Sequence, residues 1–307
     1  YLASGAVFRQ RTGPLPPGFE QHLNAVFDHA QRLEEARLKQ NPQQQEALYW
    51  LGVTHFGKTE FDFILLRSYW AAFHEGKQSL KDNQRLIALN PDFTDAYFVI
   101  GLAKYAVGTL PWYERWVASL AGIHGSIPEG ISDLDRVSQH GHYEREDARV
   151  ALVAVYERQK RYAQASALLR KIEQAYPKNY LASLEAGRIE EKEGNWRAAA
   201  QTYDAAVTNV VDGDKAAGRD PSAEVLYRGG EAHERLGELQ KALDFYNQAG
   251  RLPGKSIYIY RADFAAAELD RRLNRLPEAK GKYQIVASAL PGSSIGRRSR
   301  QALQSIH

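Results

Sequence analysis

A pattern that recurs every 34 to 43 residues constrains the fold of this 307-residue chain more than any other feature. Its clearest unit runs from Glu146 to Asn179, and further units start at Tyr180, Ala223 and Tyr260. Counted from each start, position 20 is Ala in all four units, position 8 is Gly or Ala in the last three, and position 24 is Leu or Tyr. Self-similarity of this period is typical of repeat proteins, in which each unit buries its apolar face against its neighbour.

Each recurring residue type suits a pair of antiparallel helices. Small side chains at positions 8 and 20 let the two helices approach closely, and a bulky side chain there would push them apart. Gly194 and Gly237, at position 15, supply the positive φ that ends a first helix. Pro177 and Pro291, at position 32, stop a second helix. The pattern therefore predicts a stack of helical hairpins.

This order of small and aromatic residues, held in one register over four units, resembles the tetratricopeptide repeat. The resemblance implies an all-α fold, a right-handed α-solenoid of about six helix-hairpin units with helical caps. We expect the chain to divide into an N-terminal capping segment and helix at 1–44, two elongated hairpins at 45–145, four repeat units at 146–294 with an inserted loop at 208–221, and a C-terminal capping helix at 295–307.

The two elongated hairpins are predicted from Gly52 and Gly101, which occupy position 8 of units starting near residues 45 and 94. The segments Tyr105–Pro111, Leu120–Gly125 and Gly130–Leu134 add a narrower resemblance. They are similar to the fungal inclusion-body clearance proteins, to their animal relatives in the tetratricopeptide-39-like family and to bacterial homologues. That family has no established chemistry, so this resemblance implies a fold and no catalytic residues.

Catalytic chemistry finds little support in the sequence. The chain has no Cys, which excludes thiol catalysis and Cys-ligated metals. It contains no phosphate-binding G-x-x-x-x-G-K-[ST] loop, no G-x-G-x-x-G after a strand and no G-x-S-x-G elbow. His140 and His142 form the tightest histidine cluster, but a metal site needs further ligands, and we interpret them as part of a polar turn. We expect no enzyme, no catalytic residues, no metal and no cofactor.

Charge and hydropathy limit the partners and the location. Forty Lys and Arg residues against 37 Asp and Glu residues leave a net charge of +3, too balanced for nucleic acid or an anionic membrane as the main partner. No apolar run approaches the roughly 18 residues of a transmembrane segment. The absence of Cys favours an oxidising compartment, and Tyr1–Ala6 fits the end of a signal peptide as well as it fits a frayed terminus. We predict an extracytoplasmic location, periplasmic or secreted, with a cytoplasmic one as the alternative.

Partner recognition remains as the predicted role. In tetratricopeptide arrays the first helix of each unit lines the concave face, mainly through positions 2, 5, 9 and 12. By this resemblance the partner-binding groove contains Tyr49, Phe98, Leu184, Arg188, Glu191, Tyr227, Glu231, Phe264, Glu268 and Arg271. Aromatic residues and Arg commonly anchor interfaces. An alternative for the N-terminal aromatic residues, such as Phe56 and Tyr105, is that they pack the elongated helices.

The groove lacks the Lys and Asn pair with which some members of the repeat family clamp a C-terminal carboxylate. Positions 5 and 9 hold Leu184 and Arg188 in one unit and Tyr227 and Glu231 in the next, so we expect no chaperone-tail binding. The leading hypothesis is a non-catalytic scaffold that binds another protein as a subunit or assembly factor of a larger complex. The competing hypothesis is a small-molecule, lipid or glycan-binding protein that uses the aromatic cluster Trp112, Tyr113 and Trp116.

Overall fold

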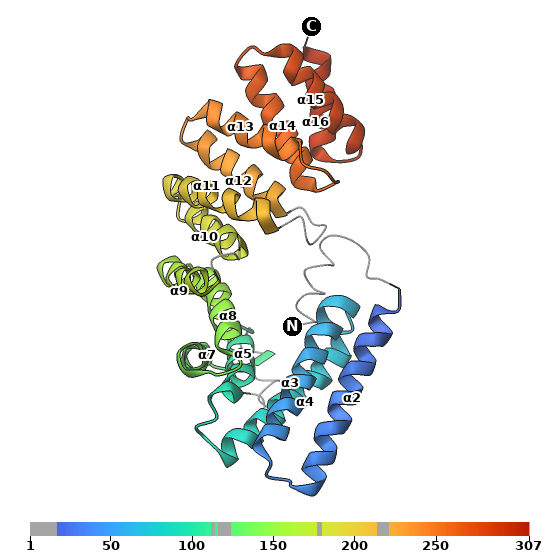
Figure 1. The fold of residues 1–307 in the computed structure, drawn as a ribbon, viewed down its shortest axis with the longest axis vertical. Coiled ribbons are helices and arrows are strands. Elements are labelled where there is room, and N and C mark those ends of the chain that lie inside the picture. Colours follow the sequence, from blue (N-terminus) through green and yellow to red (C-terminus); the bar gives the residue numbers. More distant parts are fainter. Residues whose placement is uncertain (1–16, 112–113, 116–123, 177–179, 214–220, 307) are drawn as a thin grey trace. The chain divides into compact units, whose positions relative to one another are not determined.

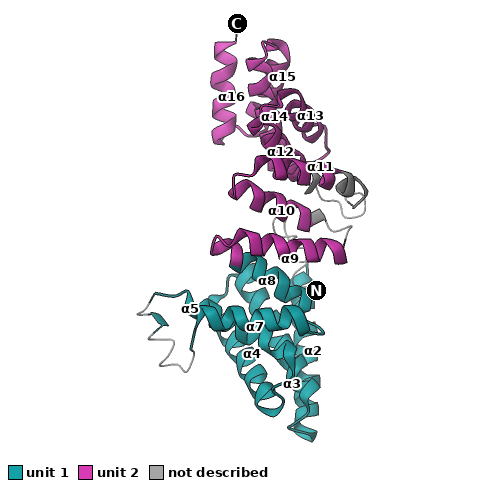
Figure 2. Ribbon diagram, turned by 90° about the vertical axis from the view of Figure 1, so that its left-hand side faces the viewer, with its two compact units in different colours: residues 1–155 teal, residues 156–307 magenta. Residues whose placement is uncertain are grey.

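The structure of the protein is a computed structural model that describes residues 17–111, 114–115, 124–176, 180–213 and 221–306. The chain divides into two compact units, residues 1–155 and residues 156–307 (Figure 2). The division falls inside helix α8 (Arg145–Arg158), ten residues beyond the end that the sequence pattern predicts for the elongated hairpins. All regular secondary structure in the described residues is helical, which confirms the predicted all-α fold class.

Unit 1 starts with the capping helix expected near residues 17–40, and this helix and α4 have 22 and 21 residues. In Figure 1, α2, α3 and α4 lie side by side. The helices of unit 1 are α2 (Phe19–Gln40), α3 (Gln45–Glu60), the π-helical segment η1 (Phe61–Leu66), α4 (Tyr69–Leu89), the 3-10 turn η2 (Thr94–Ala96), α5 (Tyr97–Gly108), α7 (Ile127–His140) and the first part of α8.

Unit 2 consists of successive helices, each packed against the next from α9 to α16 (Figure 1). They are α9 (Tyr162–Ala175), α10 (Tyr180–Lys192), α11 (Trp196–Gly213), α12 (Pro221–Arg235), α13 (Leu239–Gly250), α14 (Ile257–Arg272), α15 (Leu276–Ala289) and α16 (Ser294–Ser305). The last helix covers the final hairpin, since Ile295, Ala302 and Leu303 pack against a core that includes Phe264 and Tyr283.

The residue at position 15 has a positive φ in all four units. Gly194 and Gly237 have φ angles of 75° and 78°, as the sequence predicts, and they end the first helix of their hairpins. Lys160 and Asn274 occupy the same position with φ angles of 58° and 59°. Asn tolerates this left-handed conformation, whereas for Lys it costs roughly 1–2 kcal/mol. The turn geometry therefore repeats even where the glycine does not.

The insertion after α11 is shorter than the sequence predicts. Helix α11 continues to Gly213, so residues 208–213 are helical rather than part of the expected loop at 208–221. Residues 208–212 contain neither Gly nor Pro, and nothing in this stretch breaks a helix that is already formed. Residues 214–220 lie outside the described part of the chain, and α12 begins at Pro221, the first-turn position that proline favours.

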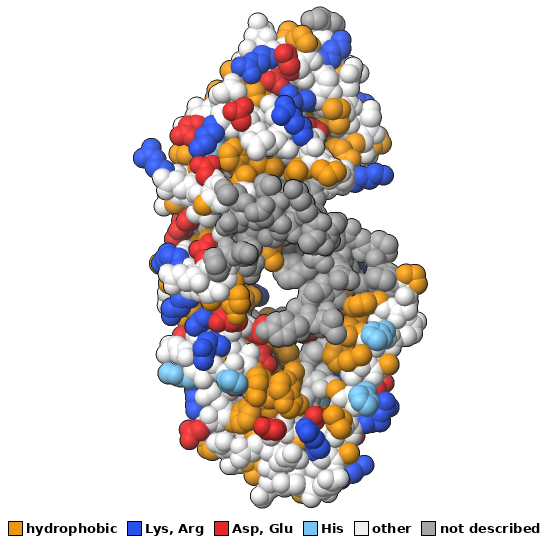
Figure 3. Space-filling view, viewed as in Figure 1, with side chains coloured by type: hydrophobic (Ala, Val, Ile, Leu, Met, Phe, Trp, Pro, Cys, Tyr) orange, Lys and Arg blue, Asp and Glu red, His pale blue; other side chains and the backbone are white. Residues whose placement is uncertain are grey.

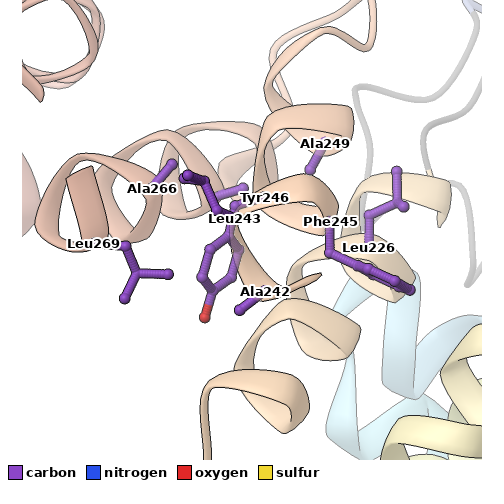
Figure 4. Packing of buried hydrophobic residues seen from close by; sticks show 9 residues of the cluster. Leu226, Ala242, Leu243, Phe245, Tyr246, Ala249, Ala266 and Leu269 are labelled. Carbon is purple, nitrogen blue, oxygen red and sulfur yellow. The ribbon is translucent and has the colours of Figure 1, made fainter. Parts of the chain in front are cut away.

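The alanines at position 20 lie where the helices of unit 2 cross most closely. Ala165, Ala199, Ala242 and Ala279 are all fully buried. Around Ala242 the core is continuous between hairpins, because Leu243 and Tyr246 of α13 lie beside Ala266 of α14 (Figure 4). Small side chains at these crossings leave room for the large aromatic residue of position 24.

The tyrosine at position 24 packs directly on the residue at position 8. Tyr203 and Tyr246 are fully buried, and a Cβ added at Gly187 or Gly230 would overlap the ring of Tyr203 or Tyr246 respectively. These glycines sit inside helices, where glycine lowers stability by about 1 kcal/mol relative to alanine. The close approach of the ring explains why that cost is present in two successive units.

This packing makes a testable prediction for two glycines in helix interiors. Gly230→Ala should lower the free energy of unfolding by about 1–3 kcal/mol, because the added methyl group overpacks the ring of Tyr246. Gly281→Ala is the matched control, since nothing lies within 4 Å of a Cβ at that residue. It should raise stability by roughly 0.5–1 kcal/mol. Urea unfolding of both variants measures the difference, and equal midpoints would contradict the packing.

Candidate binding site

Three buried tyrosines of unit 2 donate hydrogen bonds to glutamates on the preceding helix, and we call this arrangement the tyrosine–glutamate ladder. The phenolic oxygen of Tyr203 lies 2.6 Å from Glu191, that of Tyr246 lies 3.1 Å from Glu234, and that of Tyr283 lies 2.5 Å from Glu268. The tyrosines occupy position 24 of their units. The ladder therefore connects the buried second helix of each hairpin with the face of the first helix.

Electrostatics keeps these hydroxyl groups in the donor state. Burial raises the pKa of Tyr203, Tyr246 and Tyr283, and the neighbouring glutamate carboxylate of each raises it further. A tyrosine that stays protonated offers its proton to the carboxylate at every ordinary pH. The glutamates are thus held in fixed positions along the surface of the first helices.

Arginines from the following hairpin bind to the same glutamates. Arg228 donates to Glu191 at 2.9 Å and to Glu224 at 2.9 Å, and only 19% of its side chain is exposed. Burial alone would lower the pKa of Arg228, but the hydrogen bond to Glu224 and the charge of Glu191 raise it. Arg272 donates to Glu234 at 2.7 Å. Each pairing joins one repeat unit to the next, and it holds both charges at defined places.

Four charged residues at this face surround a pocket of about 400 Å³, which we call the charged pocket: Glu231, Glu234 and Arg235 of α12 and Arg272 of α14. Glu231 accepts a hydrogen bond from the hydroxyl group of Tyr227 at 2.7 Å. Burial raises the pKa of Glu231, and the hydrogen bond from Tyr227 opposes this rise. The guanidinium of Arg235 lies over the ring of Trp196, 5.3 Å from its centroid.

The pocket has the geometry of a recognition site for polar groups. Two glutamates and two arginines face a small open volume, and each of the four has a partner that fixes it. Charges of both signs also alternate over the wider face of unit 2 that Figure 3 shows. Such a mixed surface complements a partner with its own pattern of charges and orients it.

Of the predicted groove residues, Glu231 lines the charged pocket. Tyr227 donates to Glu231, Glu191 and Glu268 belong to the tyrosine–glutamate ladder, and Arg271 donates to Glu268 at 3.3 Å. Arg188 donates to Glu185 on its own helix at 3.0 Å.

Four other predicted groove residues are core side chains in this structure. Leu184 is 7% exposed, Phe264 is 8%, Tyr49 is 1% and Phe98 is 6%. The ring of Phe98 meets that of Phe56 at 5.8 Å, and Tyr49 packs against Phe93 and Tyr143. Tyr49 and Phe98 are thus packing residues of unit 1, which is the alternative that the sequence leaves open for its N-terminal aromatic residues. We leave these four residues out of the candidate site.

Tyr49 also takes part in a buried polar cluster of unit 1. Its hydroxyl group donates to Glu144 at 2.9 Å. One oxygen of Asp95 accepts from the backbone N–H groups of Tyr143 and Glu144 at 2.9 and 2.8 Å, at the start of α8. Burial raises the pKa of Glu144 to about 7, and the charges of Asp147 and Asp95 add to the rise. Glu60 also has a raised pKa, through burial and the charge of Asp147.

The sequence interpretation missed the arginines and tyrosines that organise the candidate site. Arg228, Arg235 and Arg272 fall at positions 6, 13 and 13 of their units, outside the four positions expected to face a partner. The repeat pattern by itself assigns no hydrogen bond to the recurring Tyr at position 24. The signal that was present is the pairing of that Tyr with a Glu at position 12 in two successive units, Glu191 with Tyr203 and Glu234 with Tyr246.

The competing hypothesis depends on residues that the structure does not describe. Trp112, Tyr113 and Trp116 lie outside the described residues, and the same holds for Tyr1–Ala6, where the sequence suggests the end of a signal peptide. In the described part of the chain no group of three or more His, Asp or Glu residues is arranged to hold a metal ion. His142 serves there as a backbone donor to Asp95.

Comparison with known families identifies the repeats of the chain. Residues 150–214 and 184–256 match the model of the family described as Tetratricopeptide repeat. This part of the chain therefore consists of tetratricopeptide repeats, as the repeat pattern predicts. The narrower resemblance to the inclusion-body clearance and tetratricopeptide-39-like family stays a prediction. No curated protein sequence matches the chain.

Solved structures with a similar arrangement of helices include yeast Tom70, which shares 12% identity at a TM-score of 0.47 over 95% of this chain. This chain spans 61% of that Tom70 chain, less than two thirds. The structure of Pseudomonas aeruginosa pilF shares 13% identity at a TM-score of 0.49, with 84% of this chain and 97% of that chain covered. The structure of PilW, a type IV pilus biogenesis factor, shares 16% identity at a TM-score of 0.49, with 79% of this chain and 93% of that chain covered. All three TM-scores lie below 0.5, so these likenesses contribute nothing to the assignment of function.

Over the described helices, none is long and apolar enough to cross a membrane.

The buried acid of unit 1 makes a pH-dependent prediction. The pKa of the Glu144 carboxyl group has its ordinary value of 4.5 when the chain is unfolded, and burial raises this pKa to about 7 in the folded state. The folded state therefore binds the proton more tightly, and the stability from this group is full below pH 4.5 and is lost as the pH rises through 7. Glu144→Gln should stabilise the protein at pH 8 by on the order of 1–3 kcal/mol and leave it nearly unchanged at pH 4.

Thermal unfolding of the full chain at pH 4 and pH 8 measures this effect. Glu46→Gln is a suitable control, because Glu46 is an exposed carboxylate in the first turn of α3 of the same unit. It should give the same small change at both pH values. An equal shift for the two variants at pH 8 would contradict the burial argument for Glu144.

Proposed function

We propose that this protein is a non-catalytic scaffold, a subunit or assembly factor of a larger complex, that binds a protein partner at the charged pocket of unit 2. Tetratricopeptide repeats generally mediate protein interactions and generally lack catalytic activity. The observation that carries the proposal is the fixed set of charges at the pocket, where Glu234 is held by both Tyr246 and Arg272. A preorganised charged surface loses little entropy when a complementary partner binds.

The proposed surface is smaller and more polar than the groove expected from the sequence. It keeps Tyr227, Glu231, Glu191, Glu268 and Arg271, and it adds Glu234, Arg235 and Arg272. The charges supply orientation and rate of association, while tight binding needs apolar contact as well. The half-buried ring of Tyr227, whose hydroxyl group donates to Glu231, lies 5.8 Å from the ring of Tyr258 and is proposed to supply part of that contact.

The location of the protein is part of the same proposal. We keep the extracytoplasmic prediction, which is supported by the absence of Cys from the sequence. Fractionation of the source cells, followed by detection of the protein with an antibody, tests it. Recovery in the cytoplasmic fraction alone would select the alternative.

The test of the proposed function starts with purification of the native protein under gentle conditions. A partner protein should copurify in a fixed stoichiometry, and isolation of the chain as a lone monomer would count against the proposal. Arg272→Glu should then weaken binding of that partner by about 10- to 100-fold, because it places a third carboxylate at the pocket and leaves Glu234 without its arginine.

Arg251→Glu is the matched control for that variant. Arg251 follows α13 and is exposed, and it has no part in the charged pocket, so the same change of charge should leave partner binding within twofold of the native value. Circular dichroism melts of both variants check that unit 2 stays folded. If the two variants weaken binding equally, the effect is one of total charge, and the pocket is not the binding site.

A further inference from the structure

Four aromatic side chains of unit 1 are exposed close together, and we call them the aromatic patch: Phe63, Tyr69, Trp70 and Phe73. Their side chains are 55%, 62%, 82% and 52% exposed. The rings of Phe63 and Tyr69 lie 5.4 Å apart, and those of Trp70 and Phe73 are stacked at 6.0 Å. Single exposed apolar side chains are ordinary, but a contiguous group of large rings marks an interaction surface.

The backbone presents these rings in a defined way. After α3 the chain forms the π-helical segment η1, which ends at Arg67 with a left-handed φ of 53°. Phe61 and Leu65 of this segment are buried against Leu23 of α2, so Phe63 between them is left on the outer side. The backbone N–H of Ser68 donates to the carbonyl oxygen of Asp62 at 2.8 Å and closes the turn. The patch is therefore built on ordered helical elements.

The exposed charges that accompany the patch along η1 and α4 are basic. Arg67 precedes Tyr69, and Lys77 and Lys81 follow Trp70 and Phe73 on the same face of α4, one and two turns further on. The acidic side chain of this stretch of α4, Glu75, is half-buried and paired with His55 at 2.6 Å and with Lys58 at 3.3 Å. Glu75 is therefore engaged by His55 and Lys58, while Asp82, half-buried on the same helix, interacts with Lys81 and Arg85 and offsets part of their charge.

Three further acids lie on η1 and on the neighbouring α2: Asp62, Glu20 and Asp28. Burial raises the pKa of Asp62, and the charge of Glu75 and, more weakly, that of Glu20 add to this rise. Lys58, which binds Glu75 and also Asp28 at 3.4 Å, opposes it. Lys58 thus offsets part of the acidic charge beside the patch.

We propose that the aromatic patch docks onto the surface of a membrane that contains anionic phospholipid. Trp and Tyr rings favour the boundary between lipid headgroups and acyl chains, where an apolar body and a polar edge are both satisfied. Basic side chains behind an apolar tip are attracted to anionic headgroups, and each contributes about fivefold in affinity near the surface. The protein lies on the membrane in this arrangement and does not span it.

The geometry favours a lipid surface over a protein partner at this place. Trp70 protrudes with four-fifths of its side chain in solvent, whereas the Trp anchors of protein interfaces lie in well-packed surroundings. The net charge of the whole chain is only +3, so the attraction is a local property of the patch. This docking is independent of partner binding at the charged pocket, which lies in the other unit.

Sedimentation of the full chain with sucrose-loaded vesicles tests the proposal. Vesicles of 70% phosphatidylcholine and 30% phosphatidylserine should bind the native protein, and vesicles of phosphatidylcholine alone should bind it at least tenfold more weakly. Trp70→Ser should lower binding to the anionic vesicles by at least tenfold, and Tyr69→Ser by several-fold. The matched control is Tyr176→Ser, since Tyr176 is also half exposed but belongs to unit 2, and it should bind like the native protein.

A second pair of matched variants tests the contribution of the basic side chains. Lys77→Gln should lower binding to the anionic vesicles by about fivefold, while Lys280→Gln, an equally exposed lysine of α15, should leave it unchanged. Lack of binding by the native protein, or equal binding by Trp70→Ser, would overturn the proposal. Loss of a copurifying protein in Trp70→Ser without any vesicle binding would likewise overturn it and identify the patch as a protein interface.

Discussion

The contact between a buried tyrosine ring and the backbone of a glycine determines much of unit 2. Where Gly187 and Gly230 let the rings of Tyr203 and Tyr246 lie against the first helix, the hydroxyl groups reach across to position 12 of that helix. A glutamate at that position then satisfies the buried donor, which would otherwise cost about 1–3 kcal/mol. The absence of a side chain at each glycine thus allows the tyrosine to form its hydrogen bond. That hydrogen bond in turn holds a carboxylate in place at the surface.

In the last hairpin the buried tyrosine also donates to a glutamate, but this glutamate is at a different position of the first helix. Position 8 is Ala267 there, and position 12 is Arg271, which cannot accept a proton from Tyr283. Tyr283 donates instead to Glu268, one helical turn earlier, and Arg271 donates to the same carboxylate. The requirement that persists is a carboxylate for the buried hydroxyl group, whichever turn supplies it. Exposed ion pairs add little stability by themselves, so the value of these charges lies in the defined positions they give to a binding surface.

In unit 1 the glycines at close helix contacts face backbone atoms or a polar side chain instead of a tyrosine ring. Gly130 of α7 lies against the backbone of α5 at Gly101 and Tyr105, so that the two helices touch without side chains between them. Gly52 of α3 faces the amide of Asn83 on α4. Tyr49 and Phe98 are among the large aromatic residues that are buried in the core of unit 1. Polar groups such as the carboxyl group of Glu144 are buried beside these aromatic residues. The rings of the aromatic patch, in contrast, are exposed around the turn between η1 and α4. The two units therefore offer surfaces of different chemistry, one of paired charges and one of aromatic rings.

The sequence alone determined the hairpin stack, because the spacing of small and aromatic residues is set by local helix geometry. It located the glycine turns, the capping helices and the alanine crossings, each of which depends on residues within one repeat unit. It could not determine which aromatic residues are buried and which are exposed to solvent. Tyr49 and Tyr69 both occur in apolar stretches of unit 1, yet one is 1% exposed and the other 62%. That difference depends on the neighbouring helices and on the π-helical turn at Arg67, which rotates the chain between α3 and α4. The charged pocket likewise exists only because α14 brings Arg272 to Glu234, 38 residues away in the sequence. Contacts between repeat units follow from how the helices stack, and only the tertiary structure decides them.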